Sequence, residues 1–245
     1  MSRVSEQFQD LYEFHNLDDA VHLCVVNIGR VAEIYFPGET LTRPSVDESL
    51  FTGLFSACGL RSWNEFSSFK SFKRQIEWFC GRLAFALLDE SFLGGDHAVE
   101  KRATGEPYIS GLNQSLSISH SGFYAAAAIA PEAVSIGIDL EKIRAFQDKQ
   151  GFLRIAFPEE DSARISALSD EEILVQWTLK ECFLKIIGRG FGESLREVKI
   201  LNKGFAYKGR TLDAVARWTH LFDGHLVSAI WCDREIAEEC KRLFG

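Results

Sequence analysis

Hydrophobic and polar residues alternate most regularly along residues 134–141, and this alternation predicts a strand. Its apolar positions are Val134, Ile136, Ile138 and Leu140, and the positions between them hold Ser135, Gly137, Asp139 and Glu141. Successive side chains of a strand point to opposite faces, so the apolar set predicts one buried face. Asp139 and Glu141 are expected to project from the other face.

The two carboxylates would lie side by side on that second face, where Gly137 leaves room in front of them. Carboxylates two residues apart repel each other unless positive charge lies between them. A divalent cation would supply this charge, and ligands that are all oxygen atoms suit Mg²⁺ or Mn²⁺. A solvated strand face that carries acidic residues is the alternative interpretation.

Residues 67–92 follow helical periodicity instead. One apolar stripe is formed by Phe69, Phe72, Ile76, Phe79, Leu83 and Leu87. The basic residues Lys70, Lys73 and Arg74 lie away from this stripe, and Arg82 lies nearer its edge. These residues form either a solvated basic face or a cradle for an anion.

A second long helix is predicted from the capping box Ser169-Asp-Glu-Glu172 to Gly188. Helical spacing places Leu174, Thr178, Glu181 and Lys185 on one face. Glu181 and Lys185 make either a surface salt bridge or a third metal-binding carboxylate beside a phosphate-binding cation. The flanking apolar residues are expected to dock the helix on the sheet, and they are Ile173, Trp177, Leu184 and Ile187.

Short strands joined by turns are expected along most of the remaining chain, with a short helix within residues 1–20 and a closing helix over 235–244. Short connections imply antiparallel neighbours, so residues 115–141 predict a meander of three strands. Asp223-Gly224 is typical of a hairpin turn. The predicted strands cover residues 23–29, 31–36, 99–102, 108–109, 115–119, 123–130, 197–201, 205–207, 215–222 and 225–232.

Composition limits the classes of protein that fit. The 245 residues are 46% hydrophobic and 25% charged, enough for one large or two small domains. The net charge of −8 argues against a general nucleic-acid-binding role. The chain contains no CxxC pair, no signal peptide and no apolar run near the length of a membrane span. Six cysteines without metal-like spacing therefore predict reduced thiols in a cytoplasmic protein with no membrane partner.

His120 ends the predicted strand Ser117-Ile-Ser-His120 at a turn marked by Gly122. A histidine among serine hydroxyls at a turn can hold a phosphate, although a lone histidine is also common as a structural residue. The glycine-rich run 188–192 follows a helix and opens none, so it lacks the helix N-terminus on which phosphate loops depend.

Together, three stretches resemble the 4′-phosphopantetheinyl transferases of the Sfp-like class, whose members are pseudo-dimeric monomers. The stretches are Ser119-His120 before a turn, Gly137-Ile-Asp-Leu-Glu141, and Trp177-Thr-Leu-Lys-Glu181 with Lys185. Lys73-Arg-Gln-Ile-Glu-Trp-Phe-Cys-Gly-Arg82 also looks like the first-half helix of the enterobactin-synthetase-type branch. The resemblance covers roughly residues 66–192.

The resemblance implies an α+β fold of two similar packed halves, each with a small, mainly antiparallel sheet and a long helix. A ligand cleft would lie between them. Residues 1–131 would form the coenzyme A nucleotide side, and residues 132–245 the metal and catalytic side. The chain is expected to act as a monomer.

The resemblance also assigns roles to individual residues. The implied Mg²⁺ ligands, beside the coenzyme A pyrophosphate, are Asp139, Glu141 and Glu181. The implied phosphate-neutralising cations are Lys185 and Lys180. The implied binding residues for the ribose 3′-phosphate are Ser119 and His120, helped by Arg74, Arg82 and Arg102. The chain departs from the family at Gly105-Glu106-Pro107, where Gly-Lys-Pro is common, so either Glu106 points away from the nucleotide or Arg102 replaces the missing lysine.

The implied reaction moves the phosphopantetheine arm of coenzyme A to a serine of an apo acyl or peptidyl carrier protein. Adenosine 3′,5′-bisphosphate leaves, and Glu181, directly or through a water, removes the serine proton. Two alternatives stay open: a metal-dependent hydrolase of coenzyme A or nucleotide pyrophosphates, and a non-catalytic coenzyme A-binding module. Arg189 and Phe191 in the glycine-rich run are the expected carrier-docking residues, or Phe191 packs in the core.

Overall fold

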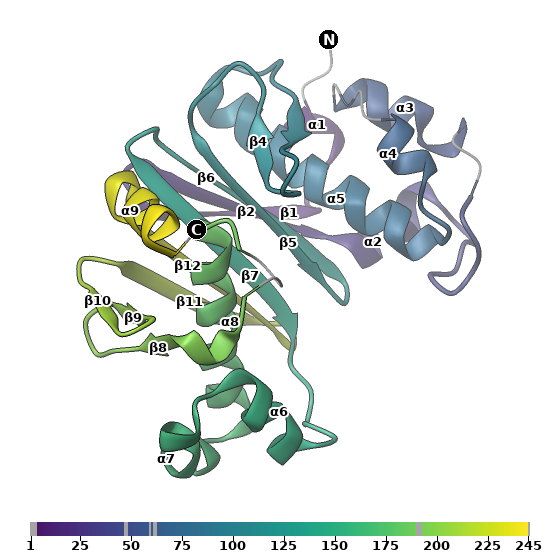
Figure 1. Cartoon of the computed structure of the whole chain (residues 1–245). Coiled ribbons are helices and arrows are strands. Elements are labelled where there is room, and N and C mark those ends of the chain that lie inside the picture. Colours follow the sequence, from purple (N-terminus) through teal and green to yellow (C-terminus); the bar gives the residue numbers. More distant parts are fainter. Residues whose placement is uncertain (1–3, 47–48, 59, 61–62, 190–192, 245) are drawn as a thin grey trace. The chain divides into compact units, whose positions relative to one another are not determined.

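The computed structural model describes residues 4–46, 49–58, 60, 63–189 and 193–244 (Figure 1). Two compact units divide the chain, Met1–Ile129 and Ala130–Gly245. Each combines antiparallel strand pairs with a helix of 17 residues, which is α5 (Phe72–Leu88) in the first unit and α8 (Asp170–Ile186) in the second. The predicted α+β class is therefore confirmed, while the predicted ligand cleft stays a prediction.

A four-stranded sheet and the helix α5 form the centre of the first unit. The sheet has the order β1-β2-β6-β5, and β2 pairs antiparallel with both β1 and β6. These strands span Tyr12–Asp18 (β1), Val21–Asn27 (β2), Ser115–Ser121 (β5) and Tyr124–Ala130 (β6). Every residue of β6 is buried, because alanine side chains let other elements approach the strand closely.

The helices of the first unit pack around a phenylalanine-rich core. Phe51 lies edge-on to Phe66 at 4.6 Å and to Phe79 of α5 at 5.7 Å, as ring centroids. The elements are α1 (Val4–Gln7), α2 (Ile28–Tyr35), α3 (Ser49–Ala57), α4 (Trp63–Ser67), α5 (Phe72–Leu88) and the π-helix η1 (Asp89–Leu93). A small hairpin joins β3 (Val99–Lys101) to β4 (Pro107–Ile109).

Two sequence-based predictions are wrong in this region. Residues 31–36 were expected to form a strand, but α2 covers most of them, because the Asn27 side chain accepts a hydrogen bond from Arg30 N at 2.9 Å and caps a helix. The expected three-stranded meander holds for β5 and β6, which are neighbours in one sheet. The third strand pairs instead with a strand from the far end of the sequence.

That third strand is β7 (Val134–Lys142), an outer strand of the second unit's main sheet. The order is β11-β12-β7, and both pairs are antiparallel. The hairpin turn at Asp223-Gly224 is confirmed, with both residues at positive φ. The sheet's other strands are β11 (Ala216–Phe222) and β12 (His225–Asp233), and a smaller sheet contains β8 (Val198–Ile200), β9 (Phe205–Tyr207) and β10 (Arg210–Leu212).

Helices of the second unit begin and end largely where the sequence predicts. Ser169 and Glu172 form the expected capping box of α8 (Asp170–Ile186), and Gly188 follows the helix at positive φ. The closing helix α9 covers Arg234–Phe244. The remaining helical segments are α6 (Lys149–Ala156), η2 (Glu159–Asp161), α7 (Ser162–Ser166) and η4 (Leu195–Glu197). Within the described chain, no helix has both the length and the apolar character to cross a membrane.

Helix α8 lies directly on the polar face of β7, and Gly137 makes this approach possible. A Cβ atom at residue 137 would overlap the carbonyl oxygen of Cys182 on α8 and lie 3.1 Å from Ile186. The Thr178 hydroxyl, one turn earlier, is 2.7 Å from the Ser228 hydroxyl on β12. Gly137 therefore makes room for a helix backbone, not for a ligand in front of the carboxylates.

The residues that attach α8 to the sheet are partly those expected, because Leu184 and Ile187 share a buried cluster with Ile230 and Cys232 of β12. Ile173 and Trp177 pack beside α6 and α7, in a cluster with Leu153, Phe157 and Ile165. Thr178 and Cys182 contact β12 instead. Both lie against Ser228, whose hydroxyl meets Thr178 and whose carbonyl oxygen is 3.3 Å from the Cys182 thiol. The expectation that Ile173 and Trp177 dock α8 on the sheet is wrong.

We expect Gly137→Ala to destabilise the protein. The added methyl group meets backbone atoms that cannot rotate away, so α8 must shift from β7, and overpacking of this kind costs about 1–3 kcal/mol. Thermal unfolding followed by circular dichroism measures the loss. Gly53→Ala is the matched control, since a Cβ there meets nothing within 4 Å. Equal melting temperatures for the two variants would contradict this account of Gly137.

Candidate functional site

The contact between α8 and β7 brings a lysine onto an aspartate. Lys185 Nζ donates one hydrogen bond to Asp139 Oδ1 at 2.7 Å and another to the Ile138 carbonyl oxygen at 2.7 Å. The Asp139 side chain is only 9% exposed, and that of Lys185 is 25% exposed. The pair is therefore largely removed from water, where charge–charge interactions are stronger than at the surface.

Glu181 lies one helical turn before Lys185 and is buried. Burial raises the pKa of the Glu181 carboxyl to about 7, and the negative charge of Asp139 adds to the rise. The Lys185 ammonium opposes this shift, and Glu141 contributes a smaller increase. Three carboxylates and one ammonium thus act on one another electrostatically.

The Lys185 ammonium stays charged in this environment. Burial is the largest single influence and would lower its pKa, but the nearby negative charges, that of Asp139 first, together outweigh burial, and the pKa of Lys185 is raised above its usual value. The Asp139 hydrogen bond and the Glu181 charge act in the same direction. A cation with this position and charge can screen a phosphate group.

The donor set has the right chemistry for Mg²⁺, because carboxylate oxygens are the ligands this ion prefers. Burial is the main cause of the raised pKa of Glu181, and the charges of Asp139 and Glu141 that add to it would also favour a cation. Among the residues that the structure describes, however, no three His, Cys, Asp or Glu side chains form a ready-made metal site. Metal binding by Asp139, Glu141 and Glu181 therefore stays a prediction.

Lys180 is buried and engaged within the fold. Its Nζ donates to the Ala156 carbonyl oxygen at 2.8 Å and to the Leu195 carbonyl oxygen at 3.0 Å, and it lies 4.3 Å from the centre of the Phe157 ring. Burial lowers the pKa of Lys180 to about 7. These contacts tie α8 to the end of α6 and to η4, and the predicted role of Lys180 in phosphate binding stays a prediction.

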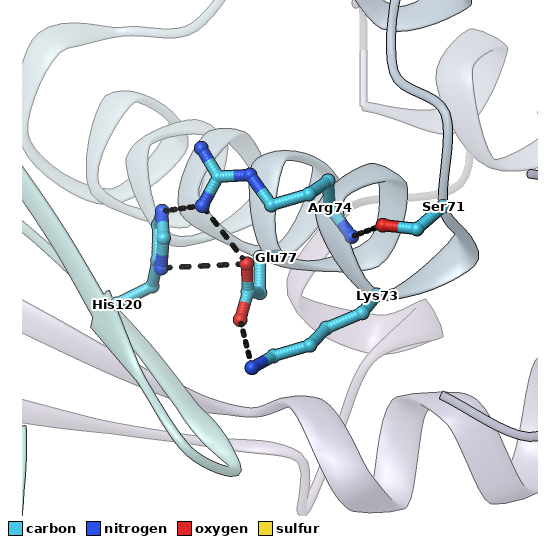
Figure 2. Close-up of polar contacts among 5 residues, drawn as sticks. All are labelled: Ser71, Lys73, Arg74, Glu77 and His120. Carbon is cyan, nitrogen blue, oxygen red and sulfur yellow. Dashed lines mark hydrogen bonds and ion pairs between the residues drawn. The ribbon is translucent and has the colours of Figure 1, made fainter. Parts of the chain in front are cut away.

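In the first unit, His120 on β5 meets the start of α5. Its Nε2 is 3.4 Å from Arg74 Nη1, and its Nδ1 is 3.7 Å from Glu77 Oε2 (Figure 2). Ser119 precedes it on the same strand, so its side chain points to the opposite face. His120, one of the two residues expected to bind the 3′-phosphate, therefore contacts Arg74.

The other two arginines expected at the nucleotide have partners of their own. Arg82 is buried, with its guanidinium 4.6 Å from the centre of the Trp78 ring and its Nη2 3.5 Å from Glu65. Arg102 pairs with Glu106 at 3.8 Å. The charge at position 106 is thus partly balanced by Arg102, and nucleotide binding by Arg82 and Arg102 stays a prediction.

The expected carrier-docking loop is only partly visible. Gly190, Phe191 and Gly192 lie outside the described residues. Arg189 is half-buried after the end of α8. Docking by Arg189 and Phe191 stays a prediction.

Sequence reasoning missed two features of these sites. Glu77, at the centre of the contacts in Figure 2, was not singled out, although its spacing of three and four residues from Arg74 and Lys73 is a signal for helical ion pairs. Ser228 on β12 contacts α8 through Thr178. No local sequence pattern predicts this role, because the two residues are fifty positions apart.

Comparison with known protein families matches residues 135–232 to the 4′-phosphopantetheinyl transferase superfamily. The match covers less than half of the chain, but it contains β7 and α8 with all four residues Asp139, Glu141, Glu181 and Lys185. No curated protein matches the chain. The family match indicates phosphopantetheine transfer in general terms.

We expect the stability contributed by Lys180 to depend on pH. The pKa of Lys180 falls from 10.5 to about 7 on folding, so between these values the unfolded chain binds more protons than the folded one. Stability therefore rises with pH across this window, by at most about 1.4 kcal/mol per pH unit, and is flat below it. Denaturant unfolding should show that the free energy of unfolding of wild type rises relative to that of Lys180→Met as the pH increases above about 7.

Lys203→Met is the control for this measurement, because Lys203 is exposed. Its free-energy difference from wild type should stay constant over the same pH range. A constant difference for Lys180→Met as well would contradict the lowered pKa.

Proposed function

We propose that this chain transfers the 4′-phosphopantetheine arm of coenzyme A to a serine of an apo acyl or peptidyl carrier protein. The observation that supports this most is the Lys185–Asp139 contact beside the buried Glu181, which lies within the segment matched by the family. The proposal includes the Sfp-like class of these transferases. The second product is adenosine 3′,5′-bisphosphate.

The reaction replaces one phosphorus–oxygen bond by another. The serine oxygen bonds to the phosphorus of the arm, and the bond from that phosphorus to the bridging oxygen of the pyrophosphate breaks. The electron pair leaves with adenosine 3′,5′-bisphosphate, and the serine proton passes to a carboxylate, Glu181 or alternatively Glu141. A base works best when its pKa is near the working pH, and the pKa of Glu181 is about 7 as long as no cation lies beside it.

Negative charge on the phosphates must be balanced during this step. Lys185, which stays charged, would screen the leaving phosphate. Asp139, Glu141 and Glu181 would hold Mg²⁺, with Mn²⁺ as a possible substitute. When bound, this ion would supply further positive charge beside the pyrophosphate.

The first unit would recognise the nucleotide end of coenzyme A. Arg74 and His120 lie together at an exposed part of α5 and β5, where they offer N–H donors to a phosphate. A net charge of −8 would oppose an acidic carrier protein, so carrier docking would need a local basic and apolar patch. The six cysteines are buried free thiols, which supports a cytoplasmic location.

The direct test is a mass measurement on an apo carrier protein after incubation with this chain, coenzyme A and Mg²⁺. The carrier should gain one phosphopantetheine arm, and Asp139→Asn should lower the initial rate at least about a hundredfold. Asp213→Asn, a change at an exposed aspartate of the same unit, should leave the rate unchanged.

An unmodified carrier would overturn the proposal. If coenzyme A were then cleaved without carrier, the protein would be a pyrophosphate hydrolase. If coenzyme A were bound and left intact, it would be a binding module. Wild-type rates in Asp139→Asn would contradict the role given to Asp139.

A further inference from the structure

Three nitrogen-bearing side chains converge on the carboxylate of Glu77. Lys73 Nζ lies 3.6 Å from Glu77 Oε1, Arg74 Nη1 lies 3.1 Å from Oε2, and His120 Nδ1 lies 3.7 Å from Oε2 (Figure 2). Lys73, Arg74 and Glu77 are on α5, whereas His120 comes from β5. We call these four residues the Glu77 cluster.

Burial within the Glu77 cluster is uneven. The Glu77 side chain is 6% exposed, but those of Lys73 and Arg74 are each 53% exposed, and that of His120 is 29% exposed. The carboxylate thus lies beneath a surface layer of nitrogen groups. An anion that approaches from solvent meets the lysine, arginine and histidine before it meets the glutamate.

A buried carboxylate is costly unless its charge is compensated, so this arrangement needs a reason. Lysine and arginine side chains at a surface sample many rotamers, and ordering them costs conformational entropy. Glu77 orders both by drawing them toward one point, and it draws His120 to the same point. The side chains therefore lose conformational entropy on folding, and less entropy is lost when a ligand binds.

The charge of the cluster remains favourable for an anion. Two permanent cations, Lys73 and Arg74, exceed the single carboxylate, so the cluster keeps a net positive charge. The Arg74 guanidinium has five N–H donors, of which only those on Nη1 face Glu77 and His120 in these contacts. A phosphate group, with several acceptor oxygens and up to two negative charges, matches this arrangement.

We infer that Glu77 is a positioning residue that aligns Lys73, Arg74 and His120 into a phosphate-binding site. The inference rests on the proposed function for the identity of the ligand, which is then the ribose 3′-phosphate of coenzyme A. Glu77 touches no phosphate itself. Its effect is on the preference for coenzyme A over dephospho-coenzyme A, which lacks only that phosphate.

A purely structural role makes a different prediction. Ion pairs three and four residues apart stabilise a helix slightly, whatever ligand is present. Loss of such pairs would lower the melting temperature and would affect both forms of the coenzyme equally. A positioning role instead predicts weaker binding of coenzyme A and unchanged binding of dephospho-coenzyme A.

The test compares Glu77→Gln with wild type by isothermal titration calorimetry, using coenzyme A and dephospho-coenzyme A. The variant should bind coenzyme A about tenfold more weakly and dephospho-coenzyme A with unchanged affinity. Glu90→Gln is the matched control, because Glu90 accepts hydrogen bonds from the backbone of Val4 and Ser5 and lies outside the Glu77 cluster. It should keep the wild-type preference.

Other outcomes overturn the inference. An unchanged preference in Glu77→Gln would show that the carboxylate does not align the site, and equal weakening of both ligands would show a structural role. Glu77→Asp, which keeps the charge, should recover part of the preference that Glu77→Gln loses; a preference as weak in Glu77→Asp as in Glu77→Gln would show that the charge of residue 77 does not align the site.

A second experiment tests the role of Glu77 if the proposed function fails. If wild type binds neither coenzyme, the proposed function fails, and inorganic pyrophosphate becomes the probe. Its titration should shift the His120 imidazole resonance in nuclear magnetic resonance spectra of wild type and shift it much less in Glu77→Gln. No shift in wild type, or equal shifts in both proteins, would overturn the role of Glu77.

Discussion

The hydrogen-bonded ion pair between Lys185 and Asp139 is the interaction on which the second unit depends. It joins α8 to β7 across a contact so close that residue 137 must be glycine. A buried pair of this kind contributes little net stability, because both charges lose their hydration, but removal of one partner is costly. The pair therefore fixes how α8 lies on the strand, and through this it fixes where Glu181 lies.

The same interaction sets the chemistry of the site. Glu181 is buried by the packing of α8, and burial with the nearby Asp139 charge raises its pKa to about 7. In the same place the pKa of Lys185 is raised, so an acid–base group and a permanent cation lie one helical turn apart. The proposed reaction, which moves a proton from serine while phosphate charge shifts, would need both groups. One contact between a strand and a helix would then supply them.

Local patterns predicted much of this arrangement, and contacts between distant residues account for the rest. The strand β7, the capping box at Ser169 and the hairpin at Asp223-Gly224 depend on neighbouring residues, and all three are confirmed, although both faces of β7 are buried and not one. The role of Gly137 could not be predicted, because the carbonyl group that fills its side-chain position comes from Cys182. The spacing of Glu77 from Lys73 and Arg74 predicts helical ion pairs, but its contact with His120 could not be predicted, because His120 lies on another element. Residues 31–36 were mistaken for a strand because apolar residues in a short segment suit either structure.

The ion pair itself is tested most directly by a double-mutant cycle on the free energy of unfolding. Wild type, Asp139→Asn, Lys185→Met and the double variant are unfolded with denaturant under one set of conditions. Each single change leaves a charge or a polar group without its partner, so the two losses should not add. We predict a coupling energy of about 1–3 kcal/mol, with the double variant less destabilised than the sum of the single variants. Losses that add within about 0.3–0.5 kcal/mol would contradict the claim that this contact holds α8 on β7.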